Sequence, residues 1–134
     1  MVRDLNFPVQ ILGIETQREP DGLAMSSRNV YLNEKERKAA ICLWSALNEA
    51  KMGAENEGMN LAKAMTKALE IFKKEEMAKL DYLIAVEKNT FMELEGEKER
   101  MEFNGEAILL IAAFIGTTRL IDNIELNIGA GRNI

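Results

Sequence analysis

The segment AILLIAAFIGTTRLIDNIEL, residues 107–126, decides the fold of this chain. Residues 107–114 form a continuous apolar run, which is typical of a buried strand, and residues 119–126 alternate apolar with polar side chains. The short link between the two runs begins with Gly116, so we expect an antiparallel hairpin here.

Upstream of this hairpin, residues 80–87 alternate in the same way and predict a third strand. After that strand, Asn89 and Thr90 are expected to cap one helical turn that runs through Glu93. The charged run 95–102 is expected to be a solvated loop or hairpin tip.

Two amphipathic helices are expected before the strands. Asn33 and Glu36 have the spacing of a capping box, which predicts a helix over residues 34–52 that Gly53 ends. A second helical period covers residues 60–75. The apolar stripes, expected to be core, are Ala40, Leu43, Trp44, Leu47 and Ala50 in the first helix and Leu61, Met65, Ala68, Leu69 and Phe72 in the second. We therefore expect an α+β fold, with a helical pair packed on a short antiparallel sheet.

The two ends of the chain differ from this middle part. Residues 9–14, VQILGI, are a short apolar run that predicts a buried strand, which needs neighbours on both sides. Residues 15–29 contain Pro20 and Gly22, show no sustained period and are expected to be a loop. The tail 127–134 also lacks a period and is expected to fray.

Composition is that of an ordinary folded protein, with 47% hydrophobic and 29% charged residues in a chain of 134. The formal net charge is −5 without a block of like charges, which argues against nucleic-acid binding. No apolar stretch approaches the roughly 20 residues of a membrane span, so no membrane partner is expected. The one cysteine, Cys42, is expected to be a buried small hydrophobe, and a free thiol favours the cytoplasm.

The sequence contains no histidine. This excludes nucleophiles activated by histidine, histidine metal ligands and histidine general bases, and we predict no metal ligands. Ser26 and Ser27 would need a lysine as base, and the nearest in sequence, Lys35, lies inside the first expected helix.

The stretch MSSRN, residues 25–29, concentrates hydrogen-bond donors in the expected loop. Two hydroxyls and the planar guanidinium of Arg28 suit a phosphate group. The loop also lies between a buried strand and a helix, where open α/β sheets bind ligands. The alternative is a simple turn with local side-chain caps.

Two separated segments resemble the pantothenate synthetase family, ATP-dependent ligases that join pantoate to β-alanine. They are residues 1–40, MVRDLNFPVQILGIETQREPDGLAMSSRNVYLNEKERKAA, and residues 115–124, IGTTRLIDNI. The resemblance implies a pantoyl-adenylate intermediate, the products pantothenate, AMP and pyrophosphate, and Mg²⁺ accompanying ATP. It also implies a cytoplasmic enzyme that is a homodimer at full length.

The resemblance further assigns residues to ATP. The family belongs to the nucleotidyltransferases related to class I aminoacyl-tRNA synthetases, and its MSSRN loop replaces the lysine-rich phosphate loop of those enzymes. Met25, Ser26, Ser27 and Arg28 would contact ATP, and the serines and the arginine would stabilise charge on the phosphates. Gln17 would lie beside the adenine and contact it through its backbone.

The family's histidine-bearing signature, and most groups that bind pantoate and β-alanine, have no counterpart here. The chain therefore resembles a C-terminal portion that is expected to be inactive alone. Residues 1–29 would be the last strand and the phosphate loop of an absent Rossmann-like nucleotide-binding domain. Residues 30–126 would be a C-terminal lid domain and residues 127–134 a tail. The alternative from another class is a non-catalytic α+β binding or assembly module.

Overall fold

A computed structural model describes residues 18–20, 22, 23, 25 and 27–129, with only the backbone of Ser27. The predicted strand at residues 9–14 lies outside this part of the chain. The elements, in chain order, are the 3-10 helix η1 (Ser27–Tyr31), α2 (Glu34–Asn56), α3 (Leu61–Lys73), β1 (Ala78–Glu87), α4 (Glu97–Glu102), β2 (Gly105–Ile115) and β3 (Thr118–Ile128).

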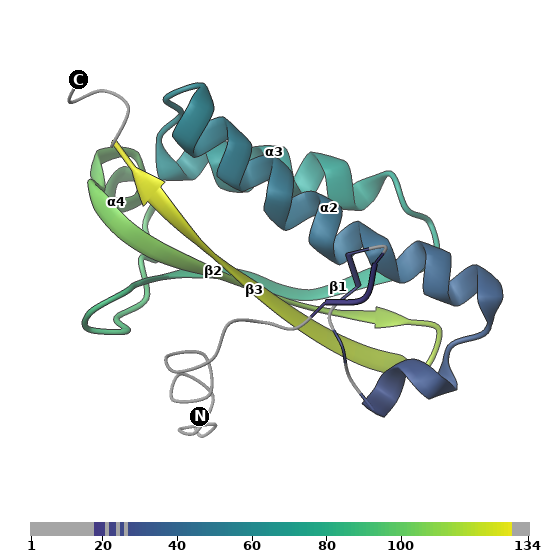
Figure 1. Cartoon of the computed structure of the whole chain (residues 1–134). Coiled ribbons are helices and arrows are strands. Elements are labelled where there is room, and N and C mark those ends of the chain that lie inside the picture. The colour runs from purple at the N-terminus through teal and green to yellow at the C-terminus, as the bar shows by residue number, and fades with distance from the viewer. Residues whose placement is uncertain (1–17, 21, 24, 26, 130–134) are drawn as a thin grey trace.

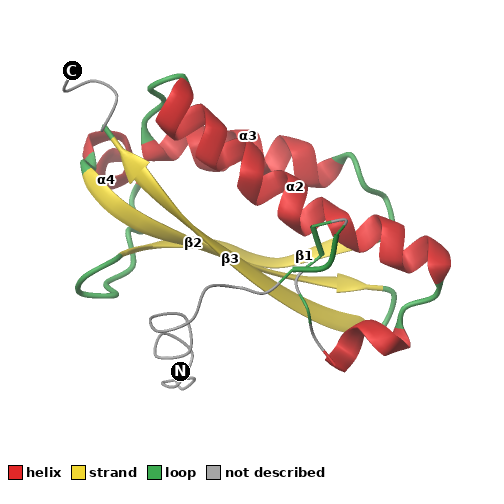
Figure 2. Ribbon diagram, viewed as in Figure 1, coloured by secondary structure: helices red, strands yellow, loops and turns green. Residues whose placement is uncertain are grey.

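Three antiparallel strands form one sheet in the order β1-β2-β3, and α2 and α3 lie over one face of it (Figure 1, Figure 2). Strands β2 and β3 pair from Gly105 opposite Ile128 to Ile115 opposite Thr118. Gly116 turns this hairpin with a φ of +62°, a backbone conformation that favours glycine. The predicted α+β fold, the hairpin and the third strand are confirmed.

The core lies between the two long helices and the sheet. Alanines on α2 bring its backbone close to the strands, and branched side chains from β2 and β3 fill the remaining space. The largest fully buried side chains of this core are Leu47, Leu61, Leu109, Ile111, Ile115, Leu126 and Ile128, whereas Ile108 packs with Val86 and Leu110 in a separate cluster. The predicted helix stripes are buried except for Trp44 and Leu69, which are half-buried, as is Cys42.

Helix α2 begins as predicted and ends later than predicted. The Asn33 side chain accepts from the Glu36 amide at 2.8 Å and the Glu36 carboxylate accepts from the Asn33 amide at 3.0 Å, which completes the capping box. The prediction that Gly53 ends the helix was wrong, because α2 continues to Asn56. Gly53 is buried inside the helix, and a Cβ there would overlap the sulfur of Met59. The glycine therefore provides room for packing.

The segment after β1 is a turn, and the helical turn predicted from Asn89 to Glu93 was wrong. The Glu87 carboxylate accepts from both the amide and the hydroxyl of Thr90, each at 2.9 Å. Phe91 follows with a φ of +59°, which is incompatible with a continuing right-handed helix. The side chain of Glu87 thus stabilises a reversal that local capping rules assigned to a helix.

The charged run 95–102 contains a short helix, α4, where a loop was predicted. The Arg100 Nε donates to the Leu94 carbonyl at 2.6 Å, and the Glu99 carboxylate accepts from the Glu95 amide at 3.2 Å. These local contacts give the segment regular structure, although no residue of α4 is buried. The expectation that the run is solvated is therefore confirmed, and the expectation of irregular structure is not.

Strand β3 reaches Ile128, which is 1% exposed, so the first two residues of the predicted tail belong to the sheet. The division of the chain at residues 29 and 126 stays a prediction. Within the described residues, no helix has both the length and the apolar character needed to cross a membrane.

Candidate phosphate-binding site

Three residues of the MSSRN stretch, Met25, Arg28 and Asn29, border a hollow of about 330 Å³ beside β3. Its lining comprises Leu23, Met25, Arg28 and Asn29 from the loop and η1, Leu43 from α2, and Arg119, Leu120, Ile121, Asp122 and Asn123 from β3. The structure thus brings Met25 and Arg28 together at one opening, where both are exposed. Ser27 is the first residue of η1, whereas Gln17 and Ser26 lie outside the described residues.

Arg28 and Arg119 are the two cationic residues that line the hollow. The Arg28 Nη1 donates to the Arg119 carbonyl at 3.2 Å, which holds η1 against the start of β3. The Arg119 Nε donates to the Asp81 carboxylate at 2.9 Å, and its guanidinium lies 5.8 Å from the centre of the Tyr82 ring. Two guanidinium groups at one hollow favour an anionic ligand, and a phosphate fits their planar donors.

A buried ion pair lies below this loop. Arg18 donates to both carboxylate oxygens of Asp122, at 2.7 and 2.9 Å, so the pair is bidentate. The same guanidinium donates to the carbonyls of Gly22 at 3.1 Å and Asn123 at 3.2 Å. It also stacks on Trp44, 3.9 Å from the ring centre. Among the described residues, Asp122 is the only buried charged one, with 2% of its side chain exposed.

Burial is the larger effect and raises the pKa of the Asp122 carboxyl, whereas the hydrogen bonds and the positive charge of Arg18 act to lower it. The bidentate geometry, together with the bond of 2.7 Å from the Asn123 amide, is that of an ionised acceptor. Arg18 is therefore the group that makes a carboxylate tolerable at this depth.

The residues around Arg18 form a compact turn. Gly22 donates its amide to the Glu19 carbonyl and Glu19 donates its own to the Leu23 carbonyl, both at 2.8 Å. Leu23 inserts into the core with 4% exposure, and Glu19 pairs with Arg37 of α2 at 2.6 Å. This turn is the purple segment beside α2 in Figure 1. The phosphate-loop candidates thus begin directly after a segment that is fixed to the domain.

Sequence reasoning missed Arg18 and Asp122 and assigned Trp44 to the core alone. A signal for Asp122 was present, because it falls between Leu120 and Ile124 on the inward-facing register of β3. A carboxylate in that register needs a buried partner. Which cation supplies it could not be deduced from spacing, since Arg18 is far away in sequence.

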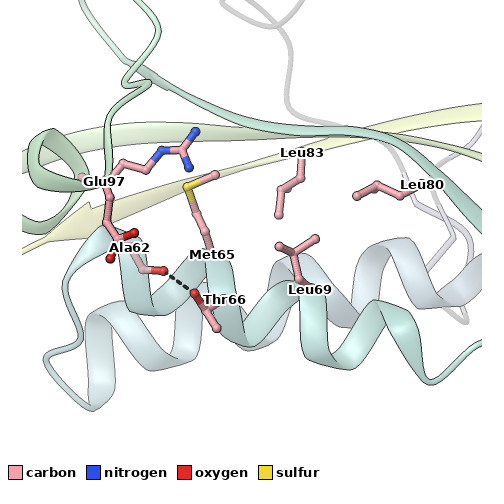
Figure 3. A pocket seen from close by; sticks show the side chains of 8 residues that line it. Ala62, Met65, Thr66, Leu69, Leu80, Leu83 and Glu97 are labelled. Atoms are coloured by element: carbon pink, nitrogen blue, oxygen red, sulfur yellow. Dashed lines mark hydrogen bonds between the residues drawn. The ribbon is translucent and has the colours of Figure 1, made fainter.

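A second hollow, of about 220 Å³, lies between α3, β1 and α4. Figure 3 shows Met65 and Leu69 facing Leu80 and Leu83 across it. At its edge the Thr66 hydroxyl is already bonded to the Ala62 carbonyl at 3.0 Å (Figure 3). Its mainly apolar lining makes it a poorer site for a nucleotide phosphate than the hollow beside β3.

Across the part of the chain that the structure describes, no three Asp, Glu or Cys side chains gather as a metal-binding group. Protein-held Mg²⁺ sites use carboxylates together with water and substrate phosphates. At the hollow beside β3, Arg28 and Arg119 are cationic, and both oxygens of the one carboxylate, Asp122, are already bonded to Arg18, so the lining suits phosphates better than a metal ion.

Comparisons with known proteins agree on one family. The model of the family described as pantoate-beta-alanine ligase matches residues 1–125. A pantothenate synthetase of Thermoanaerobacter sp. is 46% identical over 92% of this chain and 42% of its own length. One of Caldicellulosiruptor saccharolyticus is 41% identical over 96% of this chain and 43% of its own. The crystal structure of the Thermus thermophilus enzyme is 38% identical, with a TM-score of 0.72 over 92% of this chain and 42% of that chain. The chain therefore spans less than half the length of these relatives.

Proposed function

The chain belongs to the pantoate-beta-alanine ligase family, and we propose that it supplies the C-terminal domain and the ATP-phosphate loop of an enzyme that condenses pantoate with β-alanine. The observation that carries this proposal is that Met25 and Arg28 line one hollow together with Arg119. Nucleotide phosphates have the charge and the acceptor geometry that this opening favours.

The proposed reaction has two steps. A carboxylate oxygen of pantoate attacks the α-phosphorus of ATP, and the bond to the β-phosphate oxygen breaks, which releases pyrophosphate. The amine of β-alanine then attacks the acyl carbon of pantoyl adenylate, loses a proton and displaces AMP. Pantothenate is the product of this second step.

In this reaction the residues of the chain stabilise charge on the phosphates and hold the nucleotide in position. Arg28, with the hydroxyls of Ser26 and Ser27, would stabilise the charge that grows on the departing pyrophosphate. Met25 would contact the nucleotide, and the backbone of Gln17 would lie beside the adenine. Closure of the domain over the nucleotide would exclude water from the adenylate.

Magnesium would reach the site bound to ATP. We propose no ligand for it from this chain, because the described donors around the hollow are suited to phosphate. The metal would neutralise phosphate charge, and Arg28 would act on the same phosphates from the side of the protein.

The chain alone is proposed to be inactive and to bind Mg-ATP weakly, since a loop without its opposite wall competes with water for the phosphates. The assay is AMP release from Mg-ATP, pantoate and β-alanine, with and without the part of the Thermoanaerobacter sp. relative that this chain does not span. Activity only on mixing supports a split ligase. Activity of the chain alone, or micromolar Mg-ATP binding by calorimetry, contradicts the proposed division of the site. A mixture without activity contradicts the proposed function and leaves the binding-module alternative.

Arg28→Ala should lower the rate of adenylate formation in the active mixture by roughly 10² or more, the scale of losing one transition-state donor. The matched control is Lys98→Ala, which removes one exposed cation from α4 and should leave the rate unchanged. Equal rates for Arg28→Ala and the wild type would remove Arg28 from the mechanism.

We also propose that the full-length enzyme is a homodimer in the cytoplasm, which light scattering and cell fractionation would test.

A further inference from the structure

The Arg18–Asp122 pair lies at the base of the same hollow that the phosphate loop borders. Asp122 is part of its lining, and Arg18 reaches it from the turn that immediately precedes Met25. Both carboxylate oxygens are bonded to the guanidinium, which fixes the orientation of the plane as well as the distance.

Arg18 holds the turn at three independent places. It bonds to Asp122 and to the Asn123 carbonyl on β3, it bonds to the Gly22 carbonyl within its own turn, and it stacks on Trp44 of α2. A strand, a helix and the loop therefore meet at one side chain. The chain has only a few residues between Gly22 and Arg28 in which to absorb any displacement.

Charge gives Arg18 a second effect on the same hollow. Asp122 is almost completely buried, and without its cation it would be an uncompensated carboxylate beside a site for phosphates. Like charges repel more strongly in such a poorly solvated position than in water. An anchor of this loop must therefore be cationic, and the two bonds from Arg18 to Asp122 also fix its orientation.

We propose that Arg18 is a positioning residue for the phosphate loop. Through its bonds to Asp122 it sets the positions from which Met25 and Arg28 contact the nucleotide. This inference rests on the proposed function of the loop. Arg18 itself touches no substrate in this proposal. A pair that served stability alone would not change how the folded enzyme recognises ATP.

The first test uses the mixture of this chain with the remaining part of the Thermoanaerobacter sp. relative. Arg18→Met should raise the KM for ATP at least about tenfold, because small displacements of binding groups have large kinetic effects. The KM values for pantoate and β-alanine should stay unchanged. Arg18→Lys should give an intermediate KM for ATP, since lysine keeps the positive charge but cannot form the two parallel hydrogen bonds to Asp122. A lower kcat at unchanged KM for ATP would show loss of folded enzyme only and would overturn the proposal.

Lys51→Met is the matched control. The Lys51 Nζ also joins α2 to β3, with bonds of 2.8 Å to the Glu55 carboxylate and 2.9 Å to the Glu125 carbonyl, but it does not line the hollow. It should therefore leave the KM for ATP within about twofold of the wild type. An equal rise in both variants would show a general effect of loosening α2 from β3 and would count against Arg18.

A second test needs no ligase activity. The Gly22 amide is bonded to the Glu19 carbonyl and the Leu32 amide to the Asn29 carbonyl, on opposite sides of the loop. In the chain alone, Arg18→Lys and Asp122→Asn should speed hydrogen exchange at both amides, whereas Lys51→Met should not. Unchanged exchange in the two folded variants would overturn the proposal whatever the activity. Faster exchange with an inactive wild-type mixture would keep Arg18 as the anchor and reject the ligase function, so the two failures are distinguishable.

Discussion

Gly22→Ala should disrupt the packing of the turn on α2. Gly22 has a φ of +97°, and a Cβ there would overlap the Trp44 ring. A left-handed conformation costs an L-residue about 1–2 kcal/mol, and forcing a packed side chain to shift costs about 1–3 kcal/mol. Because Trp44 also stacks on Arg18, its ring cannot move aside without ending that contact. We expect the free energy of unfolding to fall by about 2–5 kcal/mol in total.

Urea denaturation followed by tryptophan fluorescence measures this effect directly. Trp44 is the one tryptophan of the sequence, so the signal reports on the ring that the substitution displaces. The native emission of the variant should also shift to the red, because the turn that shields the ring from water is lifted from it.

Gly96→Ala is the control for the change of residue type. Gly96 has a φ of −81°, and a Cβ there would meet nothing within 4 Å. Its free energy of unfolding should stay within about 0.5 kcal/mol of the wild type. A Gly22→Ala chain with the stability and the emission of the wild type would refute the packing of Gly22 on Trp44.

The remaining predictions concern the core and the cysteine. Leu109 is fully buried, and Leu109→Ala should lower the free energy of unfolding by about 2–5 kcal/mol in urea. A loss below about 1 kcal/mol would contradict close packing of Leu109 between the helices and the sheet. Burial raises the pKa of the Cys42 thiol from 9.0 to about 12, so alkylation at pH 8 should be roughly 10³-fold slower in the folded than in the unfolded chain. Equal rates would disprove the burial. Since the folded chain keeps this proton to higher pH, stability should fall from about pH 9 to about pH 12, and Cys42→Ala should remove that part of the slope.

The features that could be predicted from the sequence depend on near neighbours. The capping box needs only Asn33 and Glu36, and the β2–β3 hairpin needs two periodic runs around a glycine. Short-range geometry determines both, so a local pattern suffices. The apolar face of α2 was predictable for the same reason, because helical spacing alone brings those residues to one side.

The features that could not be predicted depend on distant contacts. Gly53 is a residue type typical of a helix end, but α2 continues past it and the Met59 side chain packs where a Cβ would lie. Trp44 fits an apolar stripe, but its ring packs on Arg18. In each case a side chain elsewhere decides the outcome. The roles of Gln17, Met25, Ser26, Ser27 and Arg28 at ATP stay predictions.

The pair of Arg18 and Asp122 joins residues that lie 104 positions apart. A ribosome therefore completes both long helices and two strands before the partner of Arg18 exists, and Asp122 faces inward only after β3 pairs with β2. Contacts between neighbouring segments form before such long closures. The turn that carries Arg18 can therefore be fixed only after β3 has formed, and an unfinished chain carries this turn without its anchor.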